Sequence, residues 1–298
     1  MMNKRYRRTK AEMNALRTAL YEIAQEIEPC SVRGLFYQIV RYGHIPKTEE
    51  AYTGIVMRLV GELREDGEMP WNWITDGTRL MRKPTTYSSM EEAARDAART
   101  YRRDLWRNQE VYLEVWCEKM ALLGVIYEVT AKWDVPLMIS RGFASKDFCY
   151  RTAESIALES KPAYLYQVGD HDPSGVKAWE AVETSIRRYL DRFFNYQECV
   201  TFDRIAVTPE QIEEYSLPTR PTKRDGNSHA RGFKGDSVEA DAMPPDVLRN
   251  LIESHIRQHV DEDALRVVQV AEKSEREALE IFAQTVGTYT PNEGQAES

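Results

Sequence analysis

Two aspartates at alternate positions, Asp170 and Asp172, are the residues of this chain best placed for chemistry. They follow the apolar run Ala163–Val168 and Gly169, and a proline, a glycine and a helical pattern come after them. This order predicts a strand, a sharp acidic turn and a helix. Ligands bind beyond the carboxyl ends of the strands in open α/β sheets, which is where both carboxylates are expected. Two such carboxylates favour a hard metal ion, and the alternative is a solvated turn that carries two acids.

A third acid, Glu118, follows another predicted strand, residues 111–117. The two strands belong to a parallel sheet, so we expect Glu118, Asp170 and Asp172 at the same sheet edge. Mg²⁺ is typically held by a few carboxylates together with water and substrate phosphates. The three acids therefore predict a Mg²⁺ site, whereas Glu118 by itself is equally typical of a helix start.

The elements that place these acids come from a regular alternation of apolar runs and helical patterns after residue 110. A parallel sheet with right-handed crossovers is expected from this alternation, and hence a mixed α/β fold. Glu114 is unusual for a strand that is otherwise fully buried. The predicted strands cover residues 111–117, 135–140, 163–168 and 201–207.

The first third of the chain has a different pattern. A basic arm, residues 1–10, precedes three predicted helices that begin at the capping residues Thr9, Ser31 and Thr48. Residues 69–76 then predict a short strand and residues 79–87 a loop or wing. Three short helices and a wing are typical of a winged helix-turn-helix, which docks on DNA, although the same architecture also serves protein contacts.

The second of these helices carries a tyrosine between two arginines. Arg33, Tyr37 and Arg41 are spaced four residues apart, so they stack along one face, away from the apolar stripe of the helix. Cations close to a phenol stabilise its phenolate and make it a better nucleophile. The alternative is a partly exposed tyrosine whose ring packs on the arginine stems.

The bulk composition places limits on the class of protein. The net charge is −8, but residues 1–110 hold 19 Lys and Arg against 16 Asp and Glu, or +3, which leaves −11 for the remainder. The excess of acidic residues therefore lies in the same part of the chain as the predicted metal site. Any contact with phosphate depends on local clusters of basic side chains. Neither a signal peptide nor a membrane-spanning run is visible. The four cysteines have no zinc spacing, so we expect a reduced, cytoplasmic protein.

Together these motifs resemble the Toprim fold of topoisomerases, primases and some nucleases, through Glu118 and the run from Gly169 to Gly175. In particular they resemble the A subunit of type IIB topoisomerase (topoisomerase VI) and the related meiotic double-strand-break transesterase, in a compact stand-alone form. Further similar segments are residues 33–37, 141–143, 202–218 and 238–245. The domains expected from this resemblance are a winged-helix (CAP-like) domain with the basic arm over residues 1–105, a Toprim domain with C-terminal helices over 106–290, and a disordered tail over 291–298.

The resemblance implies Mg²⁺-dependent DNA cleavage by tyrosine transesterification, with Tyr37 as the nucleophile that forms a 5′-phosphotyrosyl link. Arg33 and Glu118 join it as catalytic residues, Glu118 either as a metal ligand or as a general acid/base. Glu118, Asp170 and Asp172 hold the metal. Double-stranded DNA is contacted by basic residues, namely Arg33, Arg41, Lys119, Arg141, Arg224 and Arg231.

The resemblance also implies a homodimer in which the tyrosine of one protomer works with the metal of the other. The chain has no ATP-binding motif, so strand passage needs a separate ATPase (B-type) subunit. Gly34 stands where the family usually has Asp. Two alternatives remain open: a Toprim hydrolytic nuclease or nickase that does not use the tyrosine, and a DNA-binding module with a vestigial site.

Overall fold

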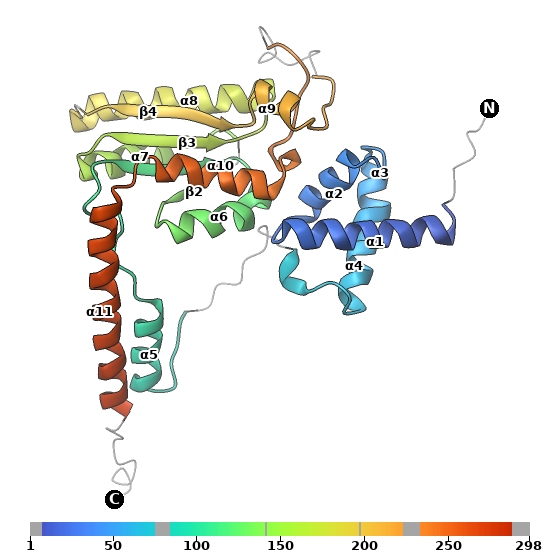
Figure 1. The fold of residues 1–298 in the computed structure, drawn as a ribbon. Helices are drawn as coiled ribbons and strands as arrows, with labels where there is room; N and C mark the ends of the chain where they lie inside the picture. The colour runs from blue at the N-terminus through green and yellow to red at the C-terminus, as the bar shows by residue number, and fades with distance from the viewer. Residues whose placement is uncertain (1–7, 75–83, 141, 197, 223–232, 288–298) are drawn as a thin grey trace, which may run out of the picture. The chain divides into compact units, whose positions relative to one another are not determined.

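The computed structural model describes residues 8–74, 84–140, 142–196, 198–222 and 233–287 (Figure 1). The chain divides into two compact units, one formed by residues 1–79 and 111–258 and the other by residues 80–110 and 259–298. This division differs from the expected boundary near residue 105, which remains a prediction about folding domains. None of the helices in the described part of the chain is long and apolar enough to span a membrane.

The sheet of the first unit has four parallel strands in the order β2-β1-β3-β4. The predicted mixed α/β fold with a parallel sheet is therefore confirmed. The expected second strand, residues 135–140, is shorter in the structure, where it covers three residues. The strands are β1 (Tyr112–Cys117), β2 (Leu137–Ile139), β3 (Ala163–Val168) and β4 (Val200–Ala206).

Helices cover both faces of this sheet (Figure 1). On one face, α7 and α8 form an apolar cluster with side chains from β1, β3 and β4 that includes Trp116, Leu165 and Trp179. On the other face, α6 packs against α10. The helical elements of this part are η3 (Met120–Leu122), α6 (Leu123–Lys132), α7 (Lys146–Glu159), α8 (Pro173–Tyr189), η4 (Leu190–Phe194), α9 (Pro209–Glu214), η6 (Ala240–Ala242) and α10 (Pro245–Arg257).

The N-terminal helices of the first unit begin where the capping residues predict. Thr9 forms a capping box with Glu12, and the hydroxyls of Ser31 and Thr48 accept hydrogen bonds from the third residue of their helices. The third helix contains a π-helical turn. The elements are α1 (Lys10–Ile27), α2 (Val32–Arg41), α3 (Glu49–Ala51), η1 (Tyr52–Val56), α4 (Met57–Glu65) and η2 (Trp71–Trp73).

The prediction of a strand at residues 69–76 is wrong for residues 69–74, which are the part of it that the structure describes. Trp71–Trp73 form a single 3₁₀ turn after Pro70, and Ile74 makes only an isolated parallel bridge with Cys30. Trp73 packs on α1, with 5.3 Å between the ring centroids of Tyr21 and Trp73, whereas Trp71 is exposed and lies under the Arg64 guanidinium. Of the expected wing, residues 79–83 lie outside the described residues and 84–87 have no regular structure.

The second unit is an antiparallel pair of helices, α5 (Met90–Thr100) and α11 (Glu262–Gly287). The first of these helices ends at Thr100, and the chain that follows it contacts α11 through polar groups. Tyr101 Oη donates to Glu275 (2.7 Å), and the Arg103 amide donates to Glu272 (2.9 Å). These polar contacts fix the register between the chain that follows α5 and the middle of α11.

The sheet core contains one unusual acid, Glu114 on β1, whose side chain is 1% exposed. Tyr112 Oη donates to one carboxylate oxygen (2.8 Å) and Trp116 Nε1 to the other (2.6 Å). Burial raises the pKa of Glu114 to about 7, against the effect of the two hydrogen bonds. The core therefore holds an acid whose ionisation opposes folding near neutral pH.

We expect Glu114→Gln to make the protein more stable relative to the wild type as the pH rises. The folded-state pKa is about 7 and the usual value is 4.5, so the wild type loses stability across this range while a glutamine does not. The amide oxygen can accept from Trp116 and the amide nitrogen can donate to Tyr112 Oη. Urea unfolding should show a gain on the order of 3 kcal/mol for the variant between about pH 4.5 and pH 8. A difference that does not change with pH would contradict a buried, titrating Glu114.

Candidate functional site

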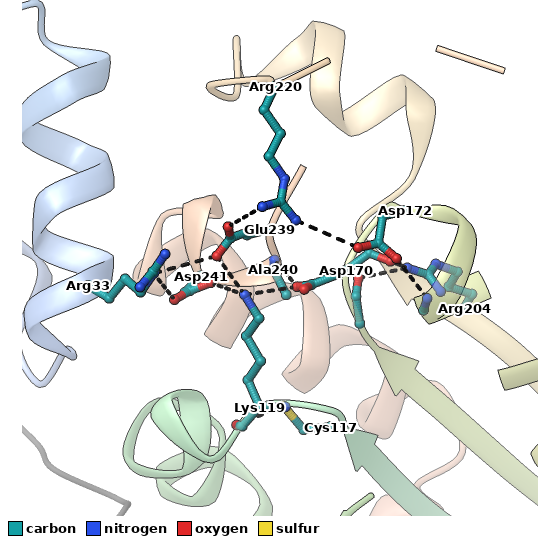
Figure 2. A network of polar contacts seen from close by, with 12 residues as sticks. Arg33, Cys117, Lys119, Asp170, Asp172, Arg204, Arg220, Glu239, Ala240 and Asp241 are labelled. Atoms are coloured by element: carbon teal, nitrogen blue, oxygen red, sulfur yellow. Dashed lines mark hydrogen bonds and ion pairs between the residues drawn. The ribbon is translucent and has the colours of Figure 1, made fainter. Parts of the chain in front are cut away.

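A network of charged side chains lies at the carboxyl edge of the sheet (Figure 2). Glu118 directly follows β1 and Asp170 closely follows β3, and these two strands are hydrogen-bonded neighbours. The expected convergence of Glu118, Asp170 and Asp172 is visible in their electrostatics, because Asp170 and Asp172 both raise the pKa of Glu118 after burial, which is the largest cause. The parallel register thus brings the acids together across about 50 residues of sequence.

The backbone of the acidic turn is held by Arg204 on β4. Its guanidinium donates to the carbonyl oxygens of Gly169 (2.8 Å) and Asp170 and to the side chain of Gln167 (3.0 Å). Arg204 is therefore a positioning residue for the turn: it binds the backbone and leaves the carboxylates of the turn to other partners. Its side chain comes from the strand next to β3, which sequence spacing did not connect with the site.

Asp172 is the N-cap of α8. One carboxylate oxygen accepts from the Gly175 amide (2.8 Å), and Pro173 occupies the first helical turn, where its missing N–H costs nothing. The other oxygen faces Arg220 at 3.7 Å. The Asp-x-Asp-Pro-x-Gly motif thus has a structural role in starting a helix as well as bringing a carboxylate to the site.

Gly175 is required because the start of α8 lies close to the turn. A Cβ at this position would lie 2.7 Å from the Asp170 carbonyl oxygen and 3.2 Å from Glu118 Oε2. The first of these is a contact with backbone, which cannot rotate away. The glycine therefore permits the approach that brings Glu118 and Asp170 together.

Lys119 lies at the centre of the network (Figure 2), and its ammonium contacts three carboxylates. The distances from Nζ are 2.6 Å to Asp241 Oδ1, 3.0 Å to Glu239 Oε2 and 3.1 Å to Asp170 Oδ1. Burial alone lowers the pKa of Lys119, but the three carboxylates outweigh it and raise the pKa. The lysine expected to contact DNA is instead bound within the protein's own acidic cluster.

Sequence reasoning did not assign Glu239 and Asp241 to the site, although the segment that contains them belongs to the resemblance. They flank Ala240, whose amide donates to Asp170 Oδ1 (2.7 Å). Their alternate spacing repeats that of Asp170 and Asp172, which was the signal that could have found them. Lys119 and Arg33 help to bring the pKa of Glu239 to about 2, although its burial acts in the opposite direction.

Tyr37 is buried, with 1% of its surface exposed, so the expectation of a partly exposed tyrosine is wrong. Its ring packs against Phe36 and under the Lys47 ammonium, which lies 5.0 Å from the ring centroid. The charges of Arg33, Glu239 and Asp241 act on its hydroxyl. Burial, followed by the charges of Glu239 and Asp241, raises the pKa of Tyr37, and Arg33 lowers it only in part.

Of the two arginines expected beside Tyr37, only Arg33 is close to the acids. Arg33 Nε lies 3.5 Å from Glu239 Oε2 and 3.9 Å from Asp241 Oδ2. Arg41 is exposed at the end of α2. Three further arginines expected to bind DNA, namely Arg141, Arg224 and Arg231, lie outside the described residues.

Gly34 brings α2 close to η6. A Cβ here would lie 3.4 Å from Ser31 Oγ and 3.8 Å from the Asp241 carbonyl oxygen, so a small side chain fits. The aspartate that the resemblance leads one to expect would add a carboxylate beside an already acidic segment. In this chain the polar contact between α2 and η6 comes from Gln38, whose side-chain amide donates to the Ala242 carbonyl oxygen (3.3 Å).

The three predicted ligands have the chemistry that a hard divalent cation needs. All are carboxylates, and Glu118 Oε2 is buried without a hydrogen-bond partner. An unpaired buried oxygen is costly unless a ligand or proton satisfies it. Within the described part of the chain, no group of three or more His, Cys, Asp or Glu side chains is arranged to hold a metal ion. The metal site therefore stays a prediction, with Glu118 as its strongest support.

Comparison of the sequence with protein-family models and with curated proteins found no match.

We expect Gly175→Ala to destabilise the protein by about 1–3 kcal/mol, because the new methyl group overlaps the Asp170 carbonyl. The matched control is Gly61→Ala in α4, where an added Cβ meets no neighbouring atom within 4 Å. That change should be neutral or stabilising by up to about 1 kcal/mol, since alanine is the better helix former. Urea unfolding followed by tryptophan fluorescence measures both. Equal stability of Gly175→Ala and the wild type would show that the close approach does not exist.

We expect Glu239→Gln to destabilise the protein most above about pH 4.5, on the order of 1–3 kcal/mol. The folded-state pKa of Glu239 is about 2 and its usual value is 4.5, so its contribution to stability is lost as the pH falls through this window. Unfolding free energies of variant and wild type should therefore converge towards about pH 2. Glu154→Gln, at an exposed position on α7, is the control and should change stability little at any pH.

Proposed function

We propose that this protein is a Mg²⁺-dependent DNA transesterase similar to the A subunit of type IIB topoisomerase. The observation that carries the proposal is that Arg33, one helical turn before Tyr37 on α2, faces Glu239 (3.5 Å), whose carboxylate shares the Lys119 ammonium with Asp170. The candidate nucleophile and a candidate metal ligand, 133 residues apart in sequence, therefore belong to one polar network. A buried tyrosine with a purely structural role needs no such neighbours.

In the proposed reaction, Tyr37 Oη attacks a backbone phosphorus of DNA. A bond forms between phosphorus and Oη, the bond from phosphorus to the 3′ oxygen breaks, and the DNA keeps a 5′-phosphotyrosyl link and a free 3′ hydroxyl. The tyrosine proton leaves and the 3′ oxygen gains one, so the step is balanced without an oxidant or reductant. Glu118 is the carboxylate we assign to proton transfer at the leaving oxygen or to metal binding.

The residues we assign to Mg²⁺ are Glu118, Asp170 and Asp172, and the bound ion would neutralise negative charge on the phosphate. Arg33 contributes a fixed positive charge next to Tyr37. It favours the phenolate, against burial and the two acids that oppose it. Incoming phosphate has to compete with Glu239 and Asp241 for the same guanidinium.

The domain arrangement in this proposal is a winged-helix domain followed by a Toprim domain, with double-stranded DNA as substrate. Two features support it: the three N-terminal helices with the predicted caps, and the four-stranded parallel sheet in which β3 leads into the acidic turn. By the same resemblance, the working form is a homodimer and strand passage requires a separate ATPase subunit.

A second candidate, a hydrolytic Toprim nuclease, is favoured by one observation. Tyr37 is almost fully buried and its pKa is raised, both of which oppose its use as a nucleophile. In this case the carboxylates act on a water molecule and Tyr37 only stabilises the contact between α2 and η6.

The two candidates predict different products from supercoiled plasmid incubated with the protein and Mg²⁺, then treated with SDS and with or without protease. For the transesterase, wild-type protein leaves covalent adducts, Tyr37→Phe reduces them to background, and Asp170→Asn does the same. The control Tyr42→Phe, at an exposed tyrosine just beyond α2, retains them. Cleavage without adducts that survives Tyr37→Phe but not Asp170→Asn supports the nuclease instead.

Mixing the Tyr37→Phe and Asp170→Asn proteins tests which protomer supplies each group. If the tyrosine works with the acids of its partner, mixed dimers keep one intact site and nick one strand with an adduct. If Tyr37 works with the acids of its own chain, where Arg33 on the same helix faces Glu239, the mixture stays inactive.

A further inference from the structure

The α5–α11 pair of the second unit uses only one face of α11. Val268 and Ala283 are its buried residues, and Glu272 and Arg276 on the same side contact the chain that follows α5. At 100° per residue, these four residues lie within roughly 80° of one another on the helix. The opposite face of α11 is largely exposed, although Val267 at its start borders the chain from Tyr101 to Asn108.

That opposite face carries a stripe of exposed apolar residues. Val267, Val270 and Ile281 are 65%, 66% and 64% exposed, and Ser274 and Ala278 continue the stripe at spacings of three or four residues. All five lie within roughly 40° of Ser274 on the helical wheel, diametrically opposite the face towards α5. A contiguous apolar stripe along a helix is a mark of an interaction surface.

The charges along one edge of this stripe change sign at its middle. Arg266 and Lys273 lie before Ser274, and Glu277 and Glu280 lie after it. On the wheel all four fall on the same side of the stripe, roughly 60–120° from Ser274. All four side chains are exposed, and Arg266 has an in-helix ion pair with Asp263 that solvent weakens.

We propose that this stripe, Val267 to Ile281, binds the same stripe of a second copy of the chain in an antiparallel helix pair with its two-fold axis at Ser274. Val267 and Ile281 lie seven residues on either side of Ser274, so they face each other across the pair. Val270 and Ala278 lie four residues on either side and also face each other. The interface is isologous, with small residues at its centre that allow close approach of the helices.

The edge charges select the antiparallel pairing with a second copy. In an antiparallel pair the same edges of both helices meet, so Lys273 faces Glu277 and Arg266 faces Glu280 of the other copy. Each pair is displaced by two residues, or about 3 Å along the axis, within reach of the side chains. A parallel pair instead places this charged edge against the other edge, which carries Ala271, Phe282 and Glu275, whose carboxylate is already bound by Tyr101 and Arg103. The surface is therefore complementary to itself in one orientation.

The first test is the oligomeric state of the full chain, measured by sedimentation velocity over a range of concentrations. The wild type should be a dimer. The double substitution Val267→Glu with Val270→Glu should raise the dissociation constant of the dimer at least about tenfold, which is about 1.4 kcal/mol. The control Gln269→Glu changes an exposed residue outside the stripe and should leave the dimer intact. A monomeric wild type, or a dimer that ignores the double substitution, overturns the proposal.

The second test fixes the geometry. Cys199 is the exposed cysteine of the chain and is first replaced by serine, while Cys30, Cys117 and Cys149 are buried. Ser274→Cys should then form a disulfide-linked dimer, whereas Gln269→Cys should not. Lys273→Glu should weaken the dimer, and adding Glu277→Lys should restore it. Absence of a Ser274→Cys crosslink from an intact dimer, or no rescue by Glu277→Lys, shows that another surface makes the dimer.

This inference does not depend on DNA cleavage. The two results can be told apart, because sedimentation and crosslinking need neither DNA nor Mg²⁺, and adduct formation is read from the DNA.

Discussion

The contact on which the first unit depends most is that of the Lys119 ammonium with Asp170, Glu239 and Asp241. These carboxylates come from the turn after β3 and from η6, and the lysine itself follows β1. Removal of one partner from a buried ion cluster typically costs about 3–5 kcal/mol, because it leaves the remaining charges uncompensated. Lys119 thus connects two strand ends to the segment against which α2 packs, and a neutral side chain could not replace it.

In the proposed transesterase, the same cluster would hold Tyr37 in an unreactive, protonated form. Glu239 and Asp241 are close enough to Tyr37 to oppose its ionisation, and Arg33 divides its charge between the phenol and the two acids. Whatever draws Arg33 or Lys119 towards a phosphate also changes the balance of charge at Tyr37. If the proposed function holds, the stability of the protein and the reactivity of the tyrosine place opposed demands on the same few side chains, as is common at functional sites.

Sequence reasoning predicted the elements whose signals are local. The caps at Thr9, Ser31 and Thr48 and the parallel strands ending at Cys117 and Val168 were all found, because capping and strand periodicity are encoded within a few residues. The acidic turn was found for the same reason. These signals were sufficient to place Glu118 and Asp170 at the same edge of a parallel sheet, and the structure shows that the strands before them are neighbours.

The errors concern contacts between distant segments. On a helical wheel Tyr37 lies off the apolar stripe, yet it is buried, because η6 brings two acids to it from about 200 residues away. Arg204 reaches the acidic turn only through the pairing of β3 with β4. The Trp71–Trp73 segment has the composition of a strand but forms a 3₁₀ turn, in which the Trp73 ring packs on Tyr21 of α1 and Trp71 is exposed. In each case tertiary packing overrode a correct local pattern.

The split composition of the second unit has a consequence for the order of folding. Some 160 residues separate the end of α5 from the start of α11, and closing a flexible loop of that length costs about 4–5 kcal/mol in chain entropy. Once the first unit has folded, Gln109 and Asp261 lie side by side, with two hydrogen bonds between them, and most of that cost has already been met. We therefore expect α5 to leave the ribosome long before its partner helix exists and to remain unpaired until the sheet has formed. The second unit can therefore form only after the chain between its two halves has folded.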